Sequence, residues 1–109
     1  MEEKMMKFNK LVRDNIPEMI KKNGQVPHTK VITEKEYKYA LEEKLKEEVN
    51  EYINDNSIEE LADVLEVLDA IVQLNEFSWQ EIIDKKIAKK EQRGDFSKRL
   101  FLIDRTEEE

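Results

Sequence analysis

The stretch Thr33–Asn75, TEKEYKYALEEKLKEEVNEYINDNSIEELADVLEVLDAIVQLN, decides the fold of this chain of 109 residues. It contains two long runs in which apolar residues recur every three or four positions, which is the period of an amphipathic helix. The short polar linker Asn54–Ser57 separates the runs. Because so short a linker returns the chain on itself, the two helices are expected to form an antiparallel hairpin. The sequence therefore predicts an all-α fold centred on this hairpin.

Capping signals place the helix boundaries. Three Ser or Thr residues are each followed three positions later by Glu, the spacing of a capping box: Thr33, Ser57 and Ser78. The helices that they open are expected to end near Ile53, Asn75 and Arg93. An earlier helix should run from about Leu11 to Asn23 and stop at Gly24, although Pro17 favours a start near Ile16. We expect these four helices to form a bundle within one domain, residues 1–109.

Composition limits the function classes. Charged residues make up 41% of the chain, with only 2 Gly and 2 Pro, a balance typical of long exposed helices. The net charge of −7 argues against binding to a nucleic-acid polymer, since two polyanions repel. There is no Cys, no apolar leader at the N-terminus and no stretch of about 20 apolar residues that could span a membrane. We expect a soluble cytoplasmic protein that does not bind membranes.

Four acids occupy positions that a surface pattern does not explain. Glu48 falls inside the apolar stripe of the first hairpin helix, and Glu51 lies at its margin. On the second helix Glu60 projects into an apolar face that Asp63 borders. Each pair is spaced i, i+3 and so shares one face of its helix, and the hairpin should bring the pairs together. An ionised carboxylate facing a core is costly unless it is paired or binds a metal ion.

Converging carboxylates are the ligands of hard divalent cations, so the four acids predict a Mg²⁺ site, with Mn²⁺ as the alternative ion. Plainer interpretations exist for single members of the set. Glu60 has the position of a capping-box glutamate, an interpretation about as good as a metal ligand when that residue is taken alone. Glu51 or Asp63 alone would be read as a solvated helix edge. The set of four on consecutive helices favours metal binding.

Three motifs resemble one enzyme family. The run Glu47-Glu48-Val49-Asn50-Glu51 followed by Glu60-Leu61-Ala62-Asp63 resembles the E-E-x-x-E and E-x-x-D signature of the all-α nucleotide pyrophosphohydrolases, the MazG-type superfamily. Lys10–Pro17, KLVRDNIP, and Arg93–Phe96, RGDF, resemble the opening and closing elements of its phosphoribosyl-ATP pyrophosphohydrolase-like branch. The three motifs occur in the family's order and span most of the chain, from about Phe8 to Ile103.

The resemblance implies a Mg²⁺-dependent hydrolase that cleaves a nucleoside triphosphate, or a related nucleotide, to the monophosphate and pyrophosphate in a house-cleaning role. Glu48, Glu51, Glu60 and Asp63 match the family's metal ligands. Glu47 matches the leading acid, which would orient or activate the attacking water, so Glu47 and Glu48 are the candidate catalytic residues. Protein cations must hold the remaining phosphates. The candidates are Lys10, Arg13, Lys90 and Arg93.

The third helix is apolar over more of its circumference than one neighbour covers, which predicts a fold completed by a homodimer or a dimer of dimers. The apolar tail between Asp95 and Arg105 is expected to dock on the bundle or on a second subunit. Two other classes of function remain open. One is a non-catalytic helical module that binds nucleotide or another protein through its acidic surface. The other is a member of the family that binds nucleotide and Mg²⁺ without turnover.

Overall fold

The computed structural model describes residues 6–108. The chain divides into two compact units, Met1–Glu76 and Phe77–Glu109. Within the described residues the elements are four α-helices, and no strand is present among them. The predicted all-α class is therefore confirmed, while the bundle, the single domain over residues 1–109 and the dimer stay predictions.

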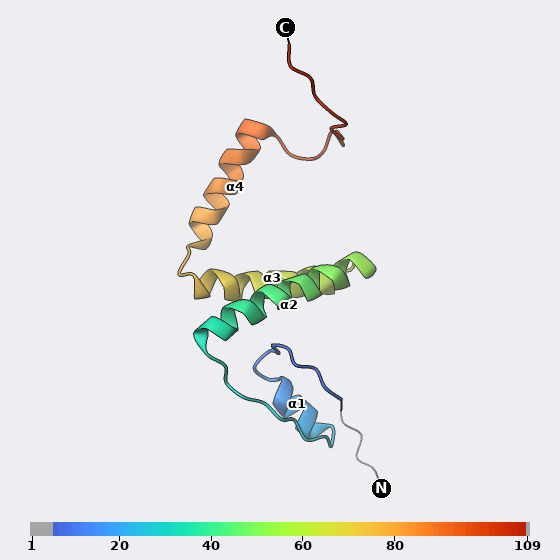
Figure 1. Ribbon diagram of the computed structural model, residues 1–109, viewed down its shortest axis with the longest axis vertical. Coiled ribbons are helices and arrows are strands. Elements are labelled where there is room, and N and C mark those ends of the chain that lie inside the picture. The colour runs from blue at the N-terminus through green and yellow to red at the C-terminus, as the bar shows by residue number, and fades with distance from the viewer. Residues whose placement is uncertain (1–5, 109) are drawn as a thin grey trace. The chain divides into compact units, whose positions relative to one another are not determined.

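The first unit is built on a helical hairpin of α2, Glu34–Asn54, and α3, Ile58–Leu74. The two helices run in opposite directions and lie side by side (Figure 1). The Thr33 side chain accepts from the backbone N–H of Glu36, and the Glu36 carboxylate accepts from the N–H of Thr33, which completes the predicted capping box of α2. Only three residues separate the helices, so the ends of α2 and α3 that meet at the linker are held close together.

The core of this unit is small and lies along the seam between α2 and α3. Its buried apolar residues are Leu41, Val67 and Val72. Full burial of one such side chain contributes about 1.5–3 kcal/mol. The one buried charged residue among those described is Glu48, which is 6% exposed. A carboxylate in so small a core is the main departure of this unit from an ordinary hairpin.

The N-terminal helix α1 is short, Ile16–Lys22, and carries Pro17 in its first turn. The longer helix from Leu11 is therefore wrong and the start near Ile16 is correct, because proline is tolerated only where its missing N–H would have no helical partner. Beyond the C-terminal end Gly24 has φ of +81°, a left-handed conformation that suits glycine. Residues 8–15 precede α1 as an irregular lead-in segment.

The second unit contains α4, Trp79–Arg93, and the tail that follows it. The Ser78 side chain accepts from the N–H of Glu81, which is one of the two bonds of the predicted capping box, and Gly94 ends the helix with φ of +84°, as predicted. The apolar residues of the tail are exposed, from 79% at Leu102 to 96% at Phe96. Their docking on the bundle or on a second subunit stays a prediction. None of the described helices combines the length and the apolar character needed to cross a membrane.

Candidate metal centre

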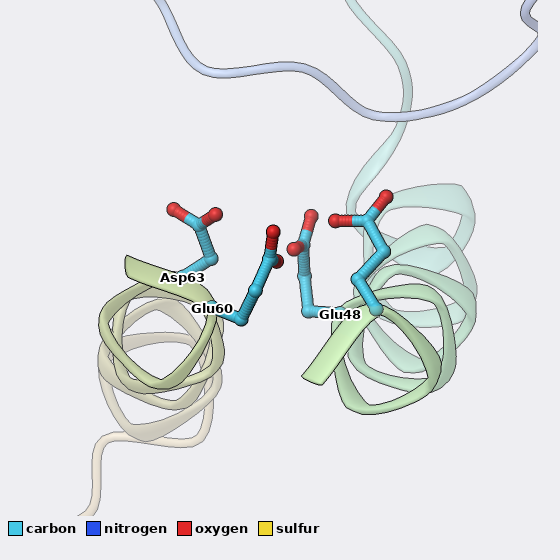
Figure 2. A group of neighbouring side chains, drawn as sticks. Glu48, Glu60 and Asp63 are labelled. Carbon is cyan, nitrogen blue, oxygen red and sulfur yellow. The ribbon is translucent and has the colours of Figure 1, made fainter. Parts of the chain in front are cut away.

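The four predicted acids come together on one side of the hairpin. Glu48 and Glu51 extend from α2, and Glu60 and Asp63 from α3. One oxygen from each carboxylate can be chosen so that all four atoms lie within 4.8 Å of one another. Figure 2 shows the labelled carboxylates of Glu48, Glu60 and Asp63 on the same side of the two helices. This is the convergence that the i, i+3 spacing on two antiparallel helices predicts.

Two oxygens of this cluster lack partners. Glu48 Oε2 and Glu60 Oε2 are buried and accept no hydrogen bond from any described residue. The Glu48 side chain as a whole is 8% exposed, so water has little access to it. A buried acceptor without a partner costs about 1–3 kcal/mol, and more when it is charged. A carboxylate with such an oxygen, clustered with three other carboxylates, fits a site built to receive a cation.

The capping interpretation of Glu60 explains only its backbone. Ser57 opens α3, and its hydroxyl accepts from the N–H of Glu60 at 3.3 Å. The Glu60 carboxyl has one buried oxygen with no partner among the described residues, so the cap does not satisfy this side chain. The cap instead fixes the first turn of α3, and thereby the position from which Glu60 extends toward α2.

Lys44 is the internal counter-ion of the cluster. It lies one turn before Glu48 on α2, and its Nζ is 3.1 Å from Glu48 Oε1 and 3.4 Å from Glu47 Oε2. Its side chain is 16% exposed, which makes this pair better shielded from solvent than an ordinary surface ion pair. Lys44 is not among the site residues predicted from the sequence. The i, i+4 spacing to an acid inside an apolar stripe is the signal that could have found it.

Burial and neighbouring charge raise the pKa of Glu48. Desolvation is the largest cause, because it disfavours the ionised form, and the nearby Glu51 carboxylate adds to it. The hydrogen bond and the positive charge of Lys44 act in the opposite direction without overcoming desolvation. A cation placed beside Glu48 would offset this effect, because it favours the ionised form of the carboxyl.

Glu47, the leading acid of the motif, has a different environment. Partial burial would raise its pKa, but a hydrogen bond from Lys10 and the charges of Lys44 and Lys10 outweigh burial and lower it. Lys10 Nζ donates to Glu47 Oε1 at 2.6 Å, and this hydrogen bond raises the pKa of Lys10. Glu47 is therefore held as an ionised carboxylate, the form that accepts a proton or a hydrogen bond from water.

A second basic residue reaches the cluster from the lead-in segment. Arg13 Nη2 donates to Asp63 Oδ1 at 2.7 Å. Lys10 and Arg13, which were predicted as phosphate ligands, thus lie at or beside the acid cluster: Arg13 pairs with Asp63 of the four acids, and Lys10 pairs with Glu47 next to Glu48. The other two predicted phosphate ligands, Lys90 and Arg93, belong to the second unit, where they line an open groove along α4 with Phe77 and Phe96. Their role at the acid cluster stays a prediction.

The donor set fits Mg²⁺ or Mn²⁺ better than softer ions. Every candidate ligand is a carboxylate oxygen, and hard divalent cations prefer oxygen, whereas thiolate and imidazole ligands select other metals. Comparison with known proteins adds no family or relative: no family model, no curated protein and no solved structure matches this chain. The arrangement of its own residues is therefore the basis for any functional conclusion.

Proposed function

We propose that this chain is a Mg²⁺-dependent nucleotide pyrophosphohydrolase of the MazG type, which hydrolyses a nucleoside triphosphate or a related nucleotide to the monophosphate and pyrophosphate. The observation that carries the proposal is the convergence of four carboxylates, two of which, Glu48 and Glu60, each have a buried oxygen without a partner among the described residues. A structural ion-pair network would be expected to pair such oxygens internally. A site for a cation leaves them for the ion.

Charge balance supports the same proposal. Glu47 and the four acids of the cluster carry five formal negative charges, and the three cations paired with them carry three positive charges: Lys10, Arg13 and Lys44. The formal remainder of two negative charges would attract a divalent cation. A triphosphate is itself strongly negative, so this acidic site can receive it only when a cation lies between carboxylate and phosphate.

In this proposal each group has a separate part in the reaction. Glu48, Glu51, Glu60 and Asp63 would hold Mg²⁺, which when bound neutralises phosphate oxygens and lowers the pKa of a water molecule. Glu47, kept ionised by Lys10 and Lys44, would accept a hydrogen bond from the attacking water and orient it toward phosphorus. Arg13 is suited to bidentate contact with phosphate, and Lys90 and Arg93 are further candidates for that role.

A dimer is part of the proposal. Ile58, Leu61 and Leu65 form one face of α3 and are 83%, 48% and 57% exposed. Apolar side chains that share an exposed helix face favour burial against another surface. A second copy of α3 would cover this face and complete a four-helix arrangement around the hairpin, as in the family that the motifs resemble.

The test is a screen for pyrophosphate release over normal and modified nucleoside triphosphates, with Mg²⁺ and with EDTA. We expect Mg²⁺-dependent release of pyrophosphate, with the monophosphate as the second product, for at least one nucleotide. Glu48→Gln should lower the rate by at least about a hundredfold, the scale on which removing one charge-stabilising group acts in other enzymes. Glu42→Gln on the exposed face of α2 is the matched control and should retain activity.

Two results would contradict the proposal. Full activity of Glu48→Gln would show that the metal assignment is wrong. If the folded protein in Mg²⁺ released pyrophosphate from none of the nucleotides, the alternative of a non-catalytic module that binds nucleotide or protein would be favoured. Calorimetry with Mg²⁺ alone separates these cases further, because a module without a metal site gives no binding heat that depends on Glu48.

A further inference from the structure

The lead-in segment before α1 is ion-paired with the hairpin at two points, once with an acid of the cluster and once with Glu47 beside the cluster. Lys10 donates to Glu47, and its Nζ also lies over the ring of Phe8, 5.9 Å from the centroid. Arg13 donates to Asp63, one of the four acids that converge. Figure 2 shows the pale blue lead-in segment on the side of the hairpin to which the labelled carboxylates point. The segment therefore carries its cations toward the side from which a ligand would approach.

The two ion pairs would respond differently to a cation in the cluster. Glu47 is outside the set of four, so its bond with Lys10 does not use a carboxylate that the metal needs. Asp63 belongs to the set, and Arg13 already draws on its negative charge at 2.7 Å. A divalent cation among the four oxygens would repel the nearby guanidinium and would compete with it for the same carboxylate.

We propose that Arg13 is a phosphate ligand released by the metal: Asp63 holds the guanidinium until a divalent cation binds the cluster, and the freed guanidinium then pairs with the phosphate of the nucleotide. This inference rests on the proposed function. Its basis is the Arg13–Asp63 ion pair together with the place of Asp63 in the cluster. Lys10, anchored by Glu47 and Phe8, keeps the segment in place while Arg13 exchanges partners.

Exchange of this kind has a mechanistic consequence. Without the cation, Arg13 is occupied by a carboxylate and the cluster repels phosphate, so nucleotide alone should bind weakly. With the cation, one carboxylate is withdrawn from Arg13 and the guanidinium becomes available for bidentate contact with phosphate. Metal and phosphate therefore bind in order and reinforce each other, and the coupling between them passes through one side chain.

The first test measures Mg²⁺ affinity by calorimetry, with no nucleotide present. Arg13→Gln removes the competitor and should tighten Mg²⁺ binding by about two- to fivefold, the range of an exposed ion pair. Lys46→Gln is the matched control, because Lys46 pairs with Glu43 on α2 and has no ion pair with the four acids. It changes the net charge by the same amount, so only the excess tightening in Arg13→Gln counts.

The second test uses the intact protein. The chain has four arginines, Arg13, Arg93, Arg99 and Arg105, so their guanidinium resonances can be resolved by ¹⁵N NMR and Arg13 assigned with Arg13→Lys. Addition of Mg²⁺ alone should shift the Arg13 signal toward that of a solvated guanidinium. Addition of inorganic pyrophosphate in the presence of Mg²⁺ should shift the Arg13 signal again. With EDTA in place of Mg²⁺, pyrophosphate should cause no shift.

The outcomes separate this inference from the proposed function. If the native protein binds Mg²⁺ through Glu48 but Arg13→Gln binds it as the control does, or more weakly, Arg13 merely positions Asp63 and the inference is overturned. An Arg13 resonance that does not shift when Mg²⁺ is added would overturn the inference as well. If the native protein binds no Mg²⁺, the proposed function fails first, and this inference fails with it.

Discussion

At the scale of single residues, Glu48 is the one charged side chain that is buried among the described residues. It sits in the stripe that also contains Leu41, so folding of the hairpin removes it from water. Lys44 pairs with one of its oxygens and leaves the other without a partner. Glu48 therefore lowers the stability of the metal-free protein and favours the binding of a cation. Functional sites commonly lower stability in this way.

The stability of Glu48→Gln as a function of pH tests this description. Burial raises the pKa of Glu48 above its ordinary value of 4.5, so the folded protein holds a proton that the unfolded chain releases first. Its contribution to stability consequently falls as pH rises from about 4.5 through the raised pKa of the folded state. Glutamine lacks this proton, so the advantage of the variant should grow over the same window and be absent below it.

In EDTA at neutral pH we expect Glu48→Gln to be more stable than the native protein by about 1 kcal/mol, the cost of one poorly satisfied buried polar group. Chemical denaturation at a series of pH values measures the difference. Glu42→Gln is exposed and should change stability by less than about 0.5 kcal/mol at every pH. A Glu48→Gln protein that is less stable than native in EDTA would mean that the Lys44–Glu48 pair outweighs desolvation.

At the scale of elements, the start of α3 connects helix capping to the site. Ser57 caps the helix through the N–H of Glu60, the residue whose carboxyl enters the cluster. A small shift of the first turn would therefore displace Glu60 directly, and Asp63 one turn later would follow. Capping at this helix end has a role in the geometry of the site as well as in stability.

Ser57→Ala should destabilise the protein by about 0.5–2 kcal/mol, as for other lost N-caps, and should also weaken Mg²⁺ binding. Ser78→Ala is the matched control, since Ser78 caps α4 by the same bond to Glu81 in the second unit. It should lower helicity or stability and leave Mg²⁺ affinity unchanged. Circular dichroism measures the loss of helix or stability, and calorimetry measures the Mg²⁺ affinity. Equal Mg²⁺ affinity in both variants would show that the Ser57 cap does not affect the metal site.

At the scale of the whole molecule, the small core and the exposed apolar side chains favour assembly. The buried apolar residues of the described chain number three, whereas Ile58, Leu61 and Leu65 together present an uncovered face of α3. A hairpin with so little buried apolar surface gains much of its stability when that face is covered. We therefore expect dimerisation and folding to be coupled.

Leu65→Glu should convert a dimer to a monomer in light scattering after gel filtration, and should lower the melting temperature at the same protein concentration. Val31→Glu is the control, because Val31 in the connector is fully exposed and belongs to no such face. The native melting temperature should rise with protein concentration. A native monomer at micromolar concentration would contradict this prediction.

The sequence by itself determined the helices α2, α3 and α4 and the residues of the cluster. Capping residues such as Thr33 and Ser57, and the short linker between the runs, specify local structure through bonds within a few positions, so their consequences can be read from the chain. The i, i+3 spacing of acids on two antiparallel helices then predicts their convergence. Pro17 likewise indicates from the sequence that α1 begins near Ile16, because proline is tolerated in the first turn of a helix.

Only the tertiary structure decided which charges meet. The Arg13–Asp63 and Lys10–Glu47 pairs join residues 50 and 37 positions apart, and no local pattern specifies such partners. The depth of Glu48, the unpartnered oxygen of Glu60 and the role of Lys44 as counter-ion likewise depend on how closely α2 and α3 pack. Desolvation and ion pairing act between atoms that only folding brings together, so they can be seen only in the tertiary structure. Helix caps and helix periodicity act between residues a few positions apart, so they can be predicted from the sequence.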